Sequence, residues 1–233
     1  MTRLILLLLL LQTPASQPVA IDAPPLATDA SLAALDASLA AIDQLAGAIQ
    51  SIDAEFVQEK RSPLLADPLI TRGRIRAIRN VSRWDAFEPQ PMVTHMSGRF
   101  LSIYYPAQSI VEEYELTDAI ATLTASVLPR LSALRETFVI SPDAGADLPA
   151  GDSSIAIRLV PRDQSLLKYV DHVRVVLDAK QGIVIAYELT DPDDEVTLTT
   201  FSHAVSNAGM TPGDLDLKLP ANVKRISPGG SAR

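Results

Sequence analysis

Residues 173–201, VRVVLDAKQGIVIAYELTDPDDEVTLTTF, decide the fold class of this protein. Apolar side chains recur at every second position in three successive runs, and this alternation predicts β-strands that bury one face. The segments DAKQG and DPDDE between the runs consist largely of residues that favour turns. Strands joined by such short turns pair antiparallel with their neighbours, so the stretch predicts a three-stranded meander.

The same alternation continues toward the N-terminus. SSIAIRL (153–159) predicts a further strand, and GRFLSIYYPAQSIVEEYEL (98–116) predicts two strands around a turn at 106–109. We interpret the carboxylates of VEEYE in the second of these strands as facing solvent. Most of the chain after residue 98 is therefore expected to contribute strands to a sheet.

RGRIRAIR (72–79) is a predicted strand whose last residue breaks the alternation of polar and apolar side chains. Alternation places Arg72, Arg74 and Arg76 on one face, which we interpret as a solvated outer face. Arg79 falls in register with the apolar face, where an unpaired charge is costly.

Two segments have apolar residues spaced by three and four, which predicts amphipathic helices. The first begins at Asp29, a suitable N-cap, and ends near Ile49 or Gln50; one strand of a coiled coil is the alternative. The second, DAIATLTASVLPRLSALRETF, predicts one or two short helices because Pro129 interrupts it. We expect a loop over 141–152. Together the elements indicate an α+β fold in which helices cover the apolar face of one sheet.

The N-terminal 16 residues have the pattern of a secretory signal: Arg3, then an apolar run over 4–11, then small residues. The run is far shorter than the ~20 residues that cross a bilayer, which disfavours a membrane anchor. Residues 17–28 are rich in Pro and Ala, so we expect a disordered lead-in. Because the sequence has no Cys, we expect an exported protein without disulfides or a lipid-modified cysteine.

The net charge and the absence of catalytic motifs limit the classes of function that the sequence supports. The 233 residues carry 20 basic and 28 acidic side chains, a net charge of -8, and loss of Arg3 with the signal makes it -9. That charge disfavours nucleic acid as a partner. No nucleophile elbow, phosphate loop or His-Glu-x-x-His motif is present, and His95, His172 and His203 are scattered along the sequence. We therefore expect a binding protein without catalytic residues, cofactor or metal.

Seven motifs, in this order, resemble the periplasmic outer-membrane lipoprotein carriers, the LolA family. They are IQSIDAEFVQEK, GRIRAIRNVSRWD, MSGRFLSIYYP, IRLVPRD, VRVVLDAKQGIVIAYELTD, TLTTFSHAVSN and LDLKLPANVKRI. The resemblance covers 32–226 and rests on the order of the motifs, since each alone is an ordinary strand with a turn. The sequence departs from the family at Asn80, where Pro is typical, and at Leu215 and Leu217, where the family has Phe-x-Phe.

The resemblance implies a single curled antiparallel sheet of about 10–11 strands, an incomplete β-barrel, under a helical lid. It implies a monomeric periplasmic carrier whose apolar cavity shields lipoprotein acyl chains between an ATP-driven inner-membrane extractor and an outer-membrane receptor. The carrier domain would span 29–226, followed by a tail at 227–233. The alternatives are a periplasmic regulator that senses lipid or lipoprotein, and a shuttle for another lipid on the same fold.

The resemblance also bears on Arg79. Either the strand ends at Ile78 and Arg79 turns to solvent, or Arg79 points inward like the family's strand-end arginine, which donates hydrogen bonds to carbonyls of the covering helices. The spacing from Gly73 to Arg79 matches the family, so we favour Arg79 as a lid latch. The side chains expected to line the acyl-chain cavity are Leu39, Ile42, Leu45, Phe56, Ile75, Trp84, Leu101, Ile103, Tyr105, Ile157, Val175, Ile185 and Leu198.

Overall fold

The computed structural model of the protein describes residues 29–78, 80–116, 131–143 and 148–228. Most of this chain is β-structure, as the period-two alternation predicts. The strands are β1 (Ser51–Arg61), β2 (Leu69–Ile78), β3 (Val81–Glu88), β4 (Met92–Ser97), β5 (Phe100–Tyr105), β6 (Ile110–Glu115), β7 (Phe138–Pro142), β8 (Ser154–Pro161), β9 (His172–Asp178), β10 (Ile183–Thr190), β11 (Val196–Ser206) and β12 (Lys224–Ile226).

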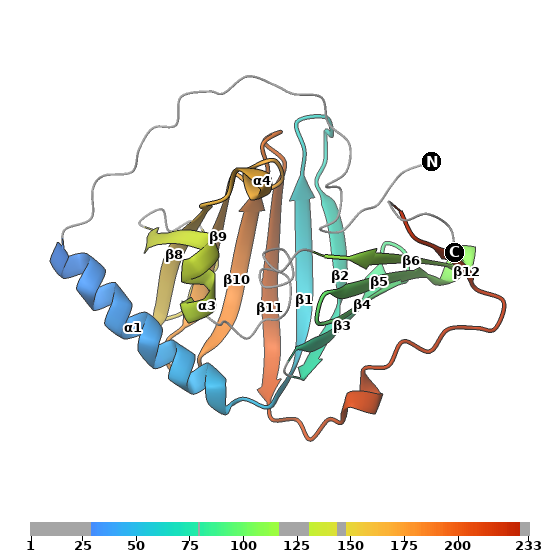
Figure 1. The fold of residues 1–233 in the computed structure, drawn as a ribbon, viewed down its shortest axis with the longest axis horizontal. Coiled ribbons are helices and arrows are strands. Elements are labelled where there is room, and N and C mark those ends of the chain that lie inside the picture. The colour runs from blue at the N-terminus through green and yellow to red at the C-terminus, as the bar shows by residue number, and fades with distance from the viewer. Residues whose placement is uncertain (1–28, 79, 117–130, 144–147, 229–233) are drawn as a thin grey trace.

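All of these strands belong to one sheet, in the order β12-β6-β5-β4-β3-β2-β1-β11-β10-β9-β8-β7 (Figure 1). Neighbours pair antiparallel except β12, which runs parallel to β6. The sheet stays open, with β7 and β12 as its edges. The expected α+β fold with a single curled, unclosed sheet is confirmed, and the two edge strands raise the number of strands above the 10–11 expected. Neither was expected, because β7 follows a helical pattern and β12 has three residues.

The described helices are few. They are α1 (Asp29–Ala48), α3 (Leu131–Thr137) and α4 (Gln164–Leu167), with 3-10 turns η1 (Pro106–Gln108) and η2 (Pro212–Asp214). The helix α1 agrees with the sequence prediction within two residues, and strand β1 follows it directly in the chain. The expected second helical segment is described only as α3. The predicted signal and lead-in, and Arg79, lie outside the described residues.

The helices α1 and α3 pack on one face of the sheet, which we call the inner face (Figure 1). Buried apolar side chains on this face form two clusters. The first, over β7–β10, contains Leu35, Leu39, Ile42, Leu131, Leu134, Phe138, Ile157, Leu159, Leu166, Val170, Val173, Val175, Leu177 and Val184. The second, centred on β1–β5, contains Ile52, Ala54, Phe56, Ile75, Ala77, Ala86, Met92, Met96, Leu101, Ile103, Leu116 and Ile183.

Aromatic side chains connect the two clusters along the inner face. The ring centroids of Phe56 and Trp84 lie 5.0 Å apart, those of Trp84 and Phe201 5.8 Å, and those of Phe201 and Tyr187 6.0 Å. Phe201 packs against both clusters. Because edge-to-face and tilted ring pairs of this spacing are favourable, the row holds the two halves of the inner face together.

The outer face of the sheet carries the arginine-rich side of β2. Arg74 donates to both carboxylate oxygens of Asp53, at 2.6 and 2.5 Å. Arg76 and Arg83 both donate to Asp85, at distances of 2.7 to 3.0 Å. The arginines predicted to be merely solvated are therefore held by carboxylates of neighbouring strands.

The segment after β11 crosses this outer face. Arg83 donates from Nη1 to the carbonyl oxygen of Asp216 at 2.7 Å, and Leu215 beside it is fully buried. The backbone N–H of Lys224 then donates to the carbonyl oxygen of Ser109 at 2.8 Å, where β12 joins the edge of the sheet. Leu215 thus fills an apolar position on the outer face, opposite the side that the helices cover.

Candidate functional site

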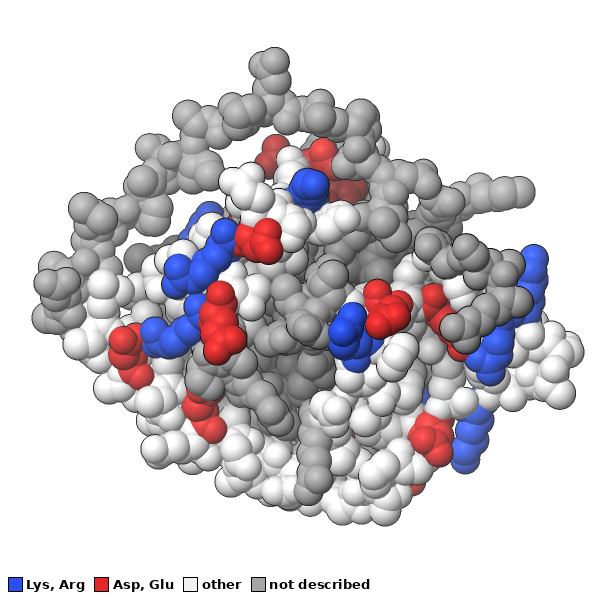
Figure 2. All heavy atoms as spheres, in the orientation of Figure 1, with Lys and Arg blue, Asp and Glu red and all other residues white. Residues whose placement is uncertain are grey.

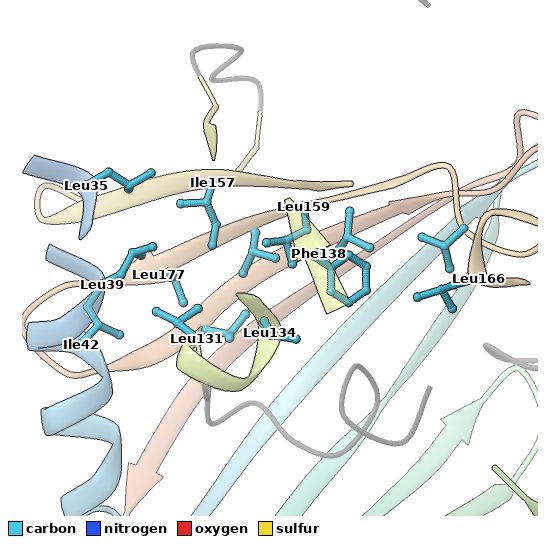
Figure 3. Close-up of a cluster of buried hydrophobic side chains, with 14 residues drawn as sticks. Leu35, Leu39, Ile42, Leu131, Leu134, Phe138, Ile157, Leu159, Leu166 and Leu177 are labelled. Carbon is cyan, nitrogen blue, oxygen red and sulfur yellow. The ribbon is translucent and has the colours of Figure 1, made fainter. Parts of the chain in front are cut away.

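Helices α1 and α3 close one half of the inner face. Leu39 and Ile42 of α1 are 2% and 0% exposed, and Leu131 of α3 is 1% exposed. Figure 3 shows their side chains directed toward Ile157 and Leu177 of the sheet. Four predicted cavity residues, namely Leu39, Ile42, Ile157 and Val175, are therefore brought together in one cluster, and in this structure the helices fill the space between them.

Two polar contacts join α1 to α3. Asp43 of α1 accepts a hydrogen bond from the backbone N–H of Leu131 at 2.8 Å, so it satisfies one of the open N–H groups at the start of α3. Arg135 of α3 donates to Asp36 of α1 at 2.5 Å, in an exposed ion pair. The helices therefore form one cover, which we call the lid.

Arg162, just after β8, ties the lid to the sheet. Its Nε–H donates to the carbonyl oxygens of Arg135 and Phe138, both at 3.1 Å, and its backbone N–H donates to the carbonyl oxygen of Thr137 at 2.9 Å. The carbonyls of Arg135 and Thr137 belong to the end of α3, where a helix leaves acceptors unsatisfied and favours a positive charge, and that of Phe138 begins β7. A latch of this chemistry was expected at Arg79, which lies outside the described residues and stays a prediction.

The turn between β9 and β10 supports the other end of the lid. Gly182 has a φ of +70°, and a Cβ atom placed there would lie 2.6 Å from Cβ of Leu45 and 2.9 Å from the backbone nitrogen of Ala46. Only glycine accommodates both this left-handed backbone and so close an approach of α1. The contact fixes where α1 ends on the sheet.

The other half of the inner face centres on Phe56. Its ring packs against Gly73, where an added Cβ would lie 2.7 Å from the ring and 2.2 Å from the carbonyl oxygen of Asp85. The predicted cavity residues Phe56, Ile75, Leu101 and Ile103 are all buried in the second cluster, and Trp84 and Tyr105 pack against it partly buried.

A polar group interrupts this apolar half. Glu112 pairs with Ile103 across β5 and β6, so its side chain lies on the inner face. Its Oε2 accepts hydrogen bonds from the hydroxyls of Tyr114 at 2.8 Å and Tyr105 at 3.4 Å. Burial, together with the negative charge and hydrogen bond of Glu112, raises the pKa of Tyr105 to about 12. Glu112 was predicted to face solvent; it is instead half-buried among aromatic side chains.

Three predicted cavity residues lie away from the two clusters. Leu45 is 40% exposed at the edge of α1. Ile185 and Leu198 pack in a third cluster, with Val176 and Ala186, on the outer face.

A β-bulge in β10 explains the position of Ile185, and the polar residues on the inner face of β11 explain that of Leu198. In β10 the pairing with β9 shifts at Ile185, so Ile185 and Ala186 both leave the inner face. In β11 the inner positions belong to Thr199 and Phe201 rather than to Leu198, and Thr199 accepts a hydrogen bond from Gln58 at 3.0 Å. The apolar alternation read in the sequence therefore marks the outer face of this strand.

The surface around the lid carries interspersed charges of both signs rather than one charged patch (Figure 2). Within the described ranges, no group of three or more metal-ligating side chains comes together. No described helix combines the length and the apolarity needed to cross a bilayer. The site is thus an apolar face with three kinds of polar feature: the hydrogen bonds that hold the lid, the carboxylate of Glu112, and the buried hydrogen bond between Gln58 and Thr199.

No family model and no curated protein sequence matches the chain. A conserved protein of uncharacterised function from Thermus thermophilus superposes with a TM-score of 0.51 at 10% identity, over 83% of this chain and 99% of that one. At this level of identity the likeness is one of fold alone. A LolA superfamily protein from Nitrosomonas europaea matches with a TM-score of 0.42 and 13% identity, over 78% of this chain and 97% of that one. A chain of the MucA/MucB complex of Pseudomonas aeruginosa matches with a TM-score of 0.44 and 14% identity, over 78% of this chain and 61% of that one.

Several residues of this site were not singled out in the sequence. Arg162 carries no local signal, because its acceptors Arg135 and Phe138 lie 27 and 24 residues away along the chain. Phe201 follows a run of polar inner positions, and an apolar pattern alone misses it. Glu112 could have been found from its position in the strand. It lies two residues before Tyr114 in β6, so the two side chains share one face.

Proposed function

We propose that this protein is a periplasmic carrier that shields the acyl chains of lipoproteins on the inner face of its half-barrel and moves them from the inner to the outer membrane. It would receive them from an ATP-driven extractor in the inner membrane and deliver them to a receptor in the outer membrane. The observation that carries the proposal is the lid, whose apolar side chains occupy the inner face and whose polar contacts lie at its rim.

The energies of lid and cargo are of the same order. A C16 chain moved from water to an apolar site gains on the order of 10 kcal/mol at ~0.8 kcal/mol per CH₂. Full burial of a Leu or Ile side chain contributes about 1.5–3 kcal/mol, so four lid side chains contribute about 6–12 kcal/mol. These four are Leu39, Ile42, Leu131 and Leu134. Exchange between lid and acyl chain is therefore close to balanced, which keeps cargo releasable.

A reversible cross-link tests the exchange. The sequence has no Cys, so the double variant Leu39→Cys/Leu177→Cys, with both positions in the first cluster, introduces the sole pair of thiols. A disulfide between them would hold α1 on the sheet. We expect the oxidised variant to lose binding of a fluorescent apolar probe, and reduction to restore it.

The single variant Leu39→Cys is the matched control, because it has the same change in α1 without the cross-link. It should bind the probe in both redox states and should not form a dimer, as a coiled coil through α1 would. Probe binding by the oxidised double variant at the wild-type level would show that acyl chains do not displace the lid, and would count against the carrier proposal.

A further inference from the structure

Glu112 lies on the inner face, and within the described ranges no basic side chain pairs with it. The neighbouring acids of β6 point outward and are paired: Glu113 with Arg225 and Glu115 with Arg99. Among the described residues, Glu112 has no Arg, Lys or His partner, and its Oε1 accepts no hydrogen bond. Alternation along the strand thus separates one inward carboxylate from two outward ones.

The surroundings of Glu112 orient its carboxylate. Both hydrogen-bond donors, Tyr105 and Tyr114, are neutral phenols, and the raised pKa of Tyr105 keeps it protonated at physiological pH. Their bonds orient Oε2 and leave Oε1 open. Ile103, fully buried, lies directly across the strand pair and forms an apolar floor beside the carboxylate.

The same row of the sheet contains a second unpartnered polar atom. Thr94 pairs with Ile103 on the other side from Glu112, and its hydroxyl oxygen is buried without a hydrogen-bond partner. A buried polar atom without a partner is destabilising. In the row Thr94, Ile103, Glu112, an apolar side chain therefore lies between two polar ones. The hydroxyl oxygen of Thr94 and Oε1 of Glu112 both lack a hydrogen-bond donor among the described residues.

We propose that Glu112, with Tyr105 and Tyr114, binds an ammonium group that lies next to the acyl chains of the ligand. This inference deepens the proposed function and rests on it. A primary ammonium donates up to three hydrogen bonds, which suits the open Oε1, and the faces of the two tyrosine rings attract a cation. The protein would select amine-bearing acyl ligands over uncharged or anionic ones of the same chain length.

Three ligands with the same chain test the inference: dodecylamine as its ammonium form, dodecanol and dodecanoate, each measured by displacement of a fluorescent apolar probe at neutral pH. A hydrogen-bonded charge pair is worth about 1.5–3 kcal/mol, so we expect dodecylamine to bind at least about tenfold more tightly than dodecanol. Dodecanoate should bind most weakly.

Two variants distinguish a specific effect of the Glu112 carboxylate from an effect of the protein's net charge. Glu112→Gln keeps the side-chain shape and removes the charge, and it should bind dodecylamine and dodecanol equally. Glu113→Gln removes the same charge from the outer side of the same strand and should keep the wild-type preference. Thermal unfolding of both variants, followed by circular dichroism, establishes that they are folded. If Glu112→Gln does not fold, Tyr114→Phe is the second variant, because it removes one donor that orients the carboxylate. It should lower the preference for dodecylamine over dodecanol at least about threefold.

The outcomes for the inference and for the carrier proposal are distinct. Equal binding of dodecylamine and dodecanol by the wild type, or an unchanged preference in Glu112→Gln, would overturn the ammonium site while leaving the carrier proposal in place. Failure of every ligand to displace the probe would overturn both.

Discussion

Replacing Arg162 by Met should loosen the lid without touching the apolar face. The substitution keeps an unbranched side chain of similar length and removes the Nε–H that reaches the carbonyl oxygens of Arg135 and Phe138, each 3.1 Å away. It also removes a positive charge at the end of α3. The backbone bond from residue 162 to Thr137 remains.

The magnitude follows from these contacts. A net hydrogen bond is worth about 0.5–1.5 kcal/mol, and a cation at an exposed helix C-terminus about 0.3–1 kcal/mol. Arg162 is exposed, so solvent and salt reduce both contributions, and we expect the closed state to lose about 1 kcal/mol. Since acyl ligands compete with the lid, the affinity for an apolar probe should rise about fivefold.

The assay is a fluorescence titration with the probe, at two salt concentrations, on three proteins. Wild type and Arg162→Met are compared with Arg158→Met, which removes the same charge from the outer side of β8. The control should bind like the wild type, and Arg162→Lys should be intermediate because an ammonium keeps the charge but loses the planar fork. An Arg162→Met protein that is folded and binds the probe no more tightly than Arg158→Met would refute the reasoning that α3 competes with ligand.

Two further predictions concern the sheet. Gly73→Ala should destabilise the protein by several kcal/mol, on the order of an overpacked core, because its Cβ would meet the ring of Phe56 and the carbonyl oxygen of Asp85; the midpoint of urea unfolding measures this, and a stability equal to wild type would contradict it. Burial raises the pKa of Asp85, but hydrogen bonds from Arg83 and Arg76 more than offset this and leave the pKa below its usual 3.8. Asp85 therefore stabilises the fold above about pH 4, and this contribution disappears as the pH falls further, so the unfolding temperature of Asp85→Asn should fall less than that of wild type between about pH 5 and pH 3.

The elements with a strong local period could be predicted from the sequence. The helix from Asp29 to Ala48 and the meander that ends in β11 follow from spacings of three to four and of two residues. These spacings state which side chains share a face, and burying that face is the main favourable term in folding. The single sheet with helices on one side therefore followed from pattern alone.

The face assignments failed where local pattern and pairing disagree. Ile185 continues the apolar alternation of its strand, yet the bulge in β10 turns it to the outer face. Leu198 continues the apolar alternation of β11, yet its neighbour Thr199 faces inward. There the Thr199 hydroxyl accepts a hydrogen bond from Gln58. A bulge and a buried hydrogen bond both depend on a partner strand, which a single strand's sequence does not contain.

The sequence by itself determined the strongly periodic elements, the single sheet and most of its inner face, because each of these depends on side chains a few residues apart. Only the tertiary structure decided how the lid is held and where the inner face is polar. Arg162 meets the end of α3, Asp43 meets Leu131, and the edge strand β12 joins β6, all through contacts between residues far apart in the chain. Such contacts form only after the sheet brings those segments together, so they leave no periodic trace in the sequence.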